Sequence, residues 1–463
     1  MTVGAGRRGR WIDEWEPEDP GFWERTGKRI AWRNLGFSIL AEHLGFNVWI
    51  LMSIVVTFLG DIGFDFSVGQ TFWLLILPNL VGAALRVPYT FAIPRFGGRA
   101  WTTISASLLL VPCVLLLIAV GTGAPYWFFL LTAAAMGFGG GNFSSSMTNI
   151  SFFFPEGRKG LALGLNAAGG NIGVAVTQLF VPIAISIGTG IHLAYAALMW
   201  MPVIVVSAAC SWFFMDSLTS ARPDGTSYRL AMRSKHTWVM AFLYIGTFGS
   251  FIGFSFAFPS LIKISFVDFE SFVGLAFLGA LIGSLSRPLG GLLADKLGGA
   301  RITLWNFAGL ALGVLGVIVS VETNSFALFF GAFIFLFVLT GVGNGSTYRM
   351  IPTIFAAEAR RRVAGTGQAE TREAANRDGL DAALKAAKRQ AGAVVGVVGA
   401  VGAFGGVLIN LVFKFSLEGG GTLTPALVAI LGFFVVCGAT TWWFYLRTAF
   451  AAERAPSLAY AQV

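Results

Sequence analysis

Two arginines stand at equivalent places in the two halves of this sequence. Arg86 precedes the glycine pair 97–98 by eleven residues, and Arg287 precedes the glycine pair 298–299 by the same eleven. Eleven helical residues rise about 16 Å, so each arginine is expected roughly halfway across an apolar layer. A guanidinium is planar, always charged and able to donate two parallel hydrogen bonds, so the pair suits a small planar oxyanion.

The other interpretation is that buried carboxylates neutralise these arginines. Few carboxylates are available for this: Asp295 falls in a turn region, Asp216 lies just past the sixth apolar stretch, and only Glu42 falls clearly inside one. Two arginines with at most one acidic partner leave a net positive charge, which is costly within lipid. This imbalance favours a mobile anion as the counter-ion.

Aromatic and amide side chains recur at helical spacing near the arginines. Tyr244, Phe248 and Phe251 fall at i, i+4 and i+7, which places them on one helix face, and Asn171 and Gln178 are seven residues apart. The chain has 44 phenylalanines, so a single ring is more often core or lipid-facing than part of a site. An amide in lipid needs a hydrogen-bond partner, which is either a neighbouring helix or a group in the cavity.

Composition determines which elements must position these residues. With 56% hydrophobic residues, only 12% charged residues and a mean hydropathy of +0.73, the chain is predicted to reside in a membrane. Its apolar runs are continuous rather than alternating, which indicates helices and excludes a β-barrel. The fold class is therefore an all-α membrane protein with twelve transmembrane helices, expected at 36–59, 67–91, 102–121, 126–153, 160–186, 190–215, 237–262, 270–293, 302–321, 326–354, 392–414 and 423–447.

The sequence also contains an internal duplication. The arginine and glycine-pair pattern repeats at an offset of 201 residues, and Gly141-Asn142 recurs as Gly343-Asn344. This predicts two pseudo-symmetric six-helix bundles with the substrate at their interface. The expected parts are an N-terminal tail at 1–35, a first bundle at 36–215, a linker at 216–236, a second bundle at 237–448 with a charged loop at about 356–390, and a C-terminal tail at 449–463.

Lysine and arginine placement predicts the orientation. The basic residues gather in the loops on the same side as the N-terminus, so both termini of this multi-pass protein are expected in the cytoplasm, below the cytoplasmic (inner) membrane. These loops and the basic first tail explain the net charge of +9, so no nucleic-acid partner is expected. The first 35 residues contain no apolar core followed by a cleavage site, so no signal peptide is expected.

No enzymatic pattern is present in the sequence. We find no phosphate-binding loop, no metal-ligand spacing and no nucleophile beside a plausible base, so neither catalysis nor a cofactor or metal is expected. Cys113, Cys210 and Cys437 are far apart inside predicted helices and are expected to be core residues.

The protein is expected to be surrounded by membrane lipid. The sequence leaves its oligomeric state open, and a monomer is the simplest expectation.

Several long motifs together resemble the nitrate/nitrite porter family of the major facilitator superfamily, most closely its NarK-type nitrate/nitrite antiporters. The run 141–179, GNFSSSMTNISFFFPEGRKGLALGLNAAGGNIGVAVTQL, is similar to the family's nitrate signature, and GNGSTYRMIPTIF at 343–355 is similar to its second copy. The likeness extends over nearly the whole chain, through the segments 15–35, 85–99, 247–255 and 286–303.

The resemblance implies the identity of the anion and the roles of several residues. In such a family the arginines matching Arg86 and Arg287 grip nitrate or nitrite, and the rings matching Phe143 and Phe248 flank it. The resemblance also implies that Tyr244, Asn171 and Gln178 are polar residues of the cavity. It further implies that Gly169 and Gly402 lie in helices that move during transport. The function implied is the exchange of nitrate for nitrite, in support of nitrate respiration or assimilation.

Glu42 and His43 depart from the apolar residues typical of the antiporters. One interpretation is structural: the two residues lie at a helix end, or Glu42 forms an ion pair with a nearby arginine. The other interpretation is a site that binds a proton. The second interpretation makes a nitrate/proton symporter the alternative function. A third hypothesis, a non-transporting nitrate sensor that makes contact through the charged loop, is weakened by the arginines present in both halves.

Overall fold

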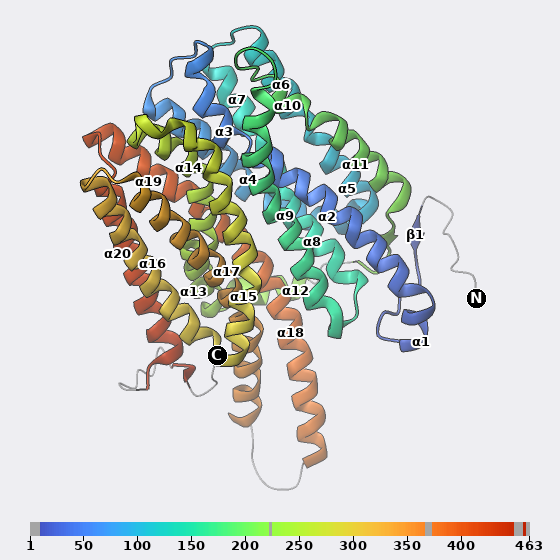
Figure 1. Cartoon of the computed structure of the whole chain (residues 1–463). Coiled ribbons are helices and arrows are strands. Elements are labelled where there is room, and N and C mark those ends of the chain that lie inside the picture. Colours follow the sequence, from blue (N-terminus) through green and yellow to red (C-terminus); the bar gives the residue numbers. More distant parts are fainter. Residues whose placement is uncertain (1–9, 222–224, 366–372, 449–456, 460–463) are drawn as a thin grey trace. The chain divides into compact units, whose positions relative to one another are not determined.

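The apolar runs fold into long helices (Figure 1). The computed structural model describes residues 10–221, 225–365, 373–448 and 457–459. In this described part, eleven helical segments are long and apolar enough to cross a membrane. The predicted span 126–153 is also helical, with a break at Gly137 between Tyr126–Met136 and Phe138–Phe153, and the two pieces together are long enough to cross a bilayer. The prediction of twelve helical spans is confirmed.

The described residues form two compact units. The first combines residues 10–221 with 252–284 and 406–423. The segments lying within it are β1 (Trp11–Ile12), α1 (Pro20–Phe22), η1 (Trp23–Gly27), α2 (Lys28–Ile50), α3 (Met52–Phe58), η2 (Gly60–Ile62), α4 (Val68–Phe96), α5 (Gly98–Leu108), α6 (Leu110–Gly121), α7 (Tyr126–Met136), α8 (Phe138–Phe153), α9 (Glu156–Ile185), α10 (Tyr195–Leu198), α11 (Met201–Phe214), β2 (Ser217–Leu218) and η4 (Val267–Ala276).

The second unit combines the described parts of 225–251, 285–405 and 424–459. The segments lying within it are α12 (Gly225–Arg233), α13 (Lys235–Tyr244), η3 (Ile245–Gly249), α16 (Gly299–Glu322), α17 (Phe326–Gly365), α18 (Glu373–Ala403), α20 (Thr424–Thr441) and η5 (Trp442–Leu446). Three helices pass from one unit into the other, namely α14 (Ser250–Ser265), α15 (Phe277–Leu297) and α19 (Gly405–Gly420).

The duplicated glycine pairs form equivalent helix boundaries. Gly97, with φ of 81°, separates α4 from α5, and Gly298, with φ of 89°, separates α15 from α16. Side chains with a Cβ rarely adopt these angles, so glycine is required at both turns. The turns predicted from the repeat are therefore confirmed.

Two very short strands are a departure from the all-helical prediction. Residues 11–12 pair in parallel with residues 217–218, so part of the expected N-terminal tail is tied to the expected linker. Nearby, Trp23 packs with Phe153 and Phe154 in a buried apolar cluster. The tail is thus folded against the first unit from residue 10 onward, and α2 begins eight residues before the predicted span.

The charged stretch at 356–390 is largely helical. Within the described residues, α17 continues to Gly365 and α18 begins at Glu373, so the two helices extend beyond the apolar part of the second unit (Figure 1). Residues 366–372 of this stretch lie outside the described residues, as do 222–224 of the linker and most of the C-terminal tail.

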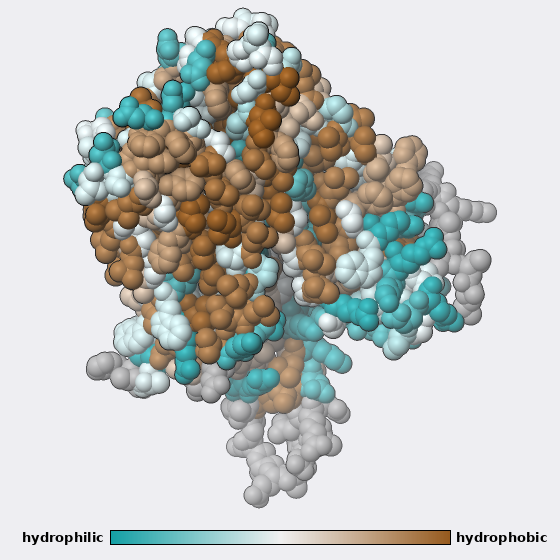
Figure 2. Space-filling view, in the orientation of Figure 1, coloured by the Kyte–Doolittle hydropathy of each residue, from teal (hydrophilic) through white to brown (hydrophobic). Residues whose placement is uncertain are grey.

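Large apolar side chains are exposed along the helices. Figure 2 shows them covering the middle of the helices, with hydrophilic residues gathered near the helix ends. Trp127, Phe213 and Trp305 are each more than 60% exposed. An apolar surface of this extent is unfavourable in water, and it suits the hydrocarbon of a bilayer.

Candidate functional site

Arg86 is completely buried in the interior of α4. Its Nε donates a hydrogen bond of 3.3 Å to the carbonyl oxygen of Gly140 on α8. The guanidinium carbon lies 4.6 Å from the centre of the Phe143 ring and 5.7 Å from that of Trp49. The cation is therefore surrounded by electron-rich ring faces and a carbonyl, groups that stabilise positive charge away from water.

Glycines bring α8 close enough to make these contacts. A Cβ added at Gly140 would lie 2.7 Å from the Cα of Gly82 on α4, and one at Gly141 would lie 2.7 Å from the ring of Tyr89. The two helix backbones therefore touch, which places the Gly140 carbonyl beside Arg86.

Arg287 has a different environment in the second unit. It is half-buried on α15, and its guanidinium carbon lies 5.2 Å from the centre of the Tyr348 ring on α17. In the described part of the chain, its Nη1 is buried without a hydrogen-bond partner. A buried donor of this kind carries a desolvation cost that a bound acceptor would remove.

Tyr244 and Phe248 belong to the same neighbourhood as Arg287. Their rings stack 5.2 Å apart at 13°, and the Tyr244 ring centre is 4.9 Å from that of Tyr348. Both side chains are almost fully buried. Tyr244 directly precedes a π-helical turn, η3, and Phe248 lies within it; such turns often occur at functional positions. The structure therefore joins Arg287 to both aromatic residues through Tyr348.

The two predicted amides are both buried on α9. Gln178 donates a 2.7 Å hydrogen bond to the carbonyl of Ser255 on α14 and a 3.4 Å bond to Ser53 Oγ. Within the described residues, the side-chain oxygens of Asn171 and Gln178 both lack a hydrogen-bond partner. Gln178 thus links α9 to α3 and α14, and each amide keeps an unused acceptor oxygen.

The two predicted conformational glycines lie at close helix contacts. A Cβ at Gly169 would collide with the side chain of Ile39 on α2, and one at Gly402 would collide with the ring of Tyr244. Both positions therefore require a small residue for packing.

Glu42 is fully buried inside α2, fourteen residues after the helix begins. Ser146 on α8 and Asn166 on α9 both donate hydrogen bonds to its carboxylate, and Asn166 also donates to Ser146 at 2.8 Å. His43 is half-buried, and its Nδ1 donates to the Gly169 carbonyl at 2.9 Å. The interpretation of these two residues as a helix-end pair is wrong, because α2 extends well past them on both sides.

The two other acids that could have neutralised the arginines have different partners. Asp216 is buried and pairs with Arg33, while Asn34 also donates to it at 2.9 Å. Asp295 forms an exposed ion pair with Arg349. Across the described residues, no three His, Cys, Asp or Glu side chains gather to hold a metal ion.

Sequence reasoning missed two aromatic residues that contact the arginines. Tyr348 lies within the second copy of the Gly-Asn motif, five residues after its first glycine, so the repeat could have indicated it. Trp49 follows Glu42 by seven residues and is fixed by a 2.8 Å hydrogen bond from its Nε1 to the Pro78 carbonyl. Its helical spacing from Glu42 and Phe46 was the available signal.

Comparison with known proteins identifies a family and several sequence relatives of this chain. The model of the Major Facilitator Superfamily matches residues 38–369. The chain is 39% identical over 459 residues to "Nitrate/nitrite transporter NarU" of Escherichia coli (strain K12), covering 95% of this chain and 97% of the relative. It is 34% identical to "Probable nitrate/nitrite antiporter NarK2" of Thermus thermophilus, with coverage of 95% and 97%.

A solved structure is similar in fold at much lower identity. The crystal structure of a D-xylose-proton symporter matches with a TM-score of 0.65 and 12% identity, covering 89% of this chain and 97% of that one. At this identity the match concerns the fold alone.

Proposed function

Since this chain belongs to the Major Facilitator Superfamily and, within it, to the nitrate/nitrite porter family, we propose that it exchanges nitrate for nitrite across the cytoplasmic membrane. The family consists of transporters, and the chain is a multi-pass membrane protein and not an enzyme. We place both termini in the cytoplasm because of the distribution of arginine and lysine, and the outer face is the opposite side of the membrane.

The observation that carries the proposal is the arginine pair at equivalent repeat positions. Arg86 is buried against Phe143 and Trp49, and Arg287 lies against Tyr348 with a buried donor to spare. Two guanidinium groups of this kind suit a small planar monoanion, because each presents parallel donors to its oxygen atoms.

Exchange follows from electrostatics if both arginines act on one substrate. Two like charges repel each other across an empty site, so closure around the empty site is unfavourable. One bound monoanion offsets this repulsion and makes closure easier from either side. Only the loaded carrier then changes conformation, and nitrate entry is coupled to nitrite exit without a proton.

The direct test is nitrate uptake into proteoliposomes that contain the purified protein. Vesicles preloaded with nitrite are compared with empty vesicles given an inward proton gradient. If the protein is an exchanger, nitrate uptake should depend on internal nitrite or nitrate and should not respond to the proton gradient. Absence of uptake under both conditions, with folded protein, would contradict the transport proposal and favour the sensor hypothesis.

Nitrate/proton symport is the second candidate, and the burial of Glu42 favours it. A buried carboxylate bonded to Ser146 and Asn166 can take up a proton within the membrane. Glu42→Gln keeps the shape and most of the hydrogen bonding of this side chain. Symport predicts that the variant loses gradient-driven uptake into empty vesicles, whereas exchange predicts that counterflow in the variant stays within about 2-fold of the wild type.

A further inference from the structure

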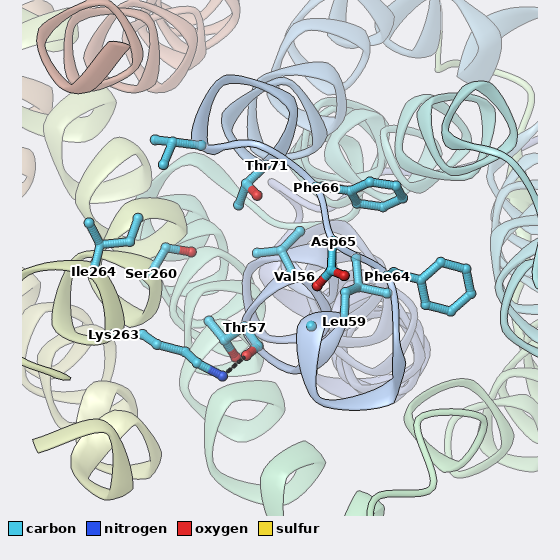
Figure 3. A pocket seen from close by; sticks show the side chains of 12 residues that line it. Val56, Thr57, Leu59, Phe64, Asp65, Phe66, Thr71, Ser260, Lys263 and Ile264 are labelled. Carbon is cyan, nitrogen blue, oxygen red and sulfur yellow. Dashed lines mark hydrogen bonds between the residues drawn. The ribbon is translucent and has the colours of Figure 1, made fainter. Parts of the chain in front are cut away.

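A small cavity lies at the outer ends of α3 and α14 (Figure 3). It has a volume of about 240 Å³ and lies within the first compact unit. Its lining includes the apolar Val56 and Phe64, and the polar Asp65, Ser260 and Lys263. Neither arginine site includes these residues, so the function proposed above leaves them unexplained.

Lys263 connects the two helices beside this cavity. Its Nζ donates a 2.7 Å hydrogen bond to the carbonyl oxygen of Thr57 and lies 3.1 Å from each carboxylate oxygen of Asp61. Figure 3 shows the lysine of α14 reaching toward Thr57. The ammonium group is thus held by three oxygen atoms from one short stretch of chain.

The end of α3 is a favourable place for this ammonium. The helix finishes at Phe58, so the Thr57 carbonyl is among the last four, which have no partner within the helix. A cation is stabilised there by the partial negative charge of the helix C-terminus. Asp61, in the turn η2 that follows, adds a full negative charge.

The contact joins parts of the chain that come from different halves of the repeat. Thr57 and Asp61 lie at and just past the end of the first predicted span, whereas Lys263 directly follows the seventh, which opens the second half. Carriers built from two repeats open by rocking one repeat against the other. In this structure the three residues lie in one compact unit, and opening to the outer face by this motion would pull Lys263 away from both of its partners.

We propose that Lys263, Asp61 and the Thr57 carbonyl form a latch that holds the outer end of the transport path closed. The latch rests on alternating access by this family and not on the identity of the anion. Both charged side chains are partly exposed, at 29% and 37%, so the contact is of moderate strength and can break in every cycle. Losing it should raise the outward-open to closed ratio about 5- to 30-fold.

Ser260 provides a reporter of latch opening. It lines the cavity, is only 3% exposed, and its hydroxyl has no hydrogen-bond partner in the described part of the chain. Ser260→Cys is introduced after the three natural cysteines have been replaced by serine. A membrane-impermeant maleimide then labels the new thiol from the outer face of intact cells, at a rate set by how often the latch opens.

Glu322 supplies the matched control. It is also an outer carboxylate with a side-chain partner, but that partner, Thr424, belongs to the same half of the repeat. Lys263→Gln and Asp61→Asn should each raise the labelling rate about 5- to 30-fold, whereas Glu322→Gln should leave it within about 2-fold. Lys263→Arg keeps the positive charge and the hydrogen-bond donors, and it should keep labelling within about 2-fold of the slow wild-type rate.

Unchanged labelling in both single variants, an equal rise in Glu322→Gln, or an equal rise in Lys263→Arg would each overturn the latch. Monodisperse elution of the purified variants excludes misfolding as the cause of faster labelling. Labelling needs no substrate, so the latch can be confirmed even if nitrate exchange fails. Normal nitrate exchange in variants with unchanged labelling would reject the latch alone.

Discussion

The two arginines occupy equivalent positions in a duplicated chain, yet their surroundings differ. Arg86 is fully buried, contacts the rings of Phe143 and Trp49, and donates to a backbone carbonyl. Arg287 is half-buried and contacts the ring of Tyr348. The first arginine is held in place by its own bundle more completely than the second.

The repeat explains how this difference arises. At the offset of 202 residues that relates Gly141-Asn142 to Gly343-Asn344, the counterpart of Phe143 is Gly345, and the counterpart of Ser146 is Tyr348. A Cβ at Gly345 would collide with the backbone carbonyl of Arg287, so no ring fits there. The aromatic contact instead comes from one helical turn later. Duplication has therefore kept the arginine and its depth, while its neighbours have diverged.

The largest expected effect on transport comes from replacing the guanidinium group of either arginine. Arg86→Lys and Arg287→Lys should each lower nitrate/nitrite counterflow by at least about 100-fold, because an ammonium cannot donate two parallel hydrogen bonds. Arg301, exposed at the start of α16, provides the matched control, and its change to lysine should leave counterflow unaltered. If only one of the two arginine sites proves sensitive, the anion is bound by one repeat alone.

The next largest effect, on stability, is expected from adding a methyl group at a close backbone contact in the second unit. Gly345→Ala should lower the free energy of unfolding by about 1–3 kcal/mol, because the new methyl group meets only backbone atoms, and these cannot move aside. Thermal unfolding of the purified protein in detergent measures this change. Gly331→Ala on the same helix has nothing within 4 Å of its new Cβ and should leave the unfolding temperature unchanged or slightly higher. Similar losses in both variants would mean that glycine's flexibility matters rather than its size.

A smaller effect is expected from the ring beside Arg287. Tyr348→Leu should raise the KM for nitrate about 3- to 30-fold, since it removes a cation–π contact that helps to position the guanidinium. Tyr348→Phe keeps the ring and should stay within about 2-fold of the wild type. An equal effect of both changes would instead assign the role to the hydroxyl group.

Part of the candidate site was accessible from the sequence. The arginine depth and the glycine turns follow from spacing along single helices, and the structure confirms the turns. The neighbours of the arginines were less accessible, since the helical spacing of Tyr244 and Phe248 indicated a shared face but not that this face meets Tyr348. The burial of Glu42 between two other helices could not be predicted either, because it depends on packing among α2, α8 and α9.

The sequence by itself determined the membrane class, the helical spans, the duplication and the two arginines within it. These properties depend on local hydrophobicity and on residue spacing, which a linear chain displays directly. Only the tertiary structure decided which rings contact each arginine, which groups bind the carboxylate of Glu42, and that Lys263 reaches Asp61. These contacts join residues from 37 to more than 200 positions apart in the chain, and they are set by how the helices pack.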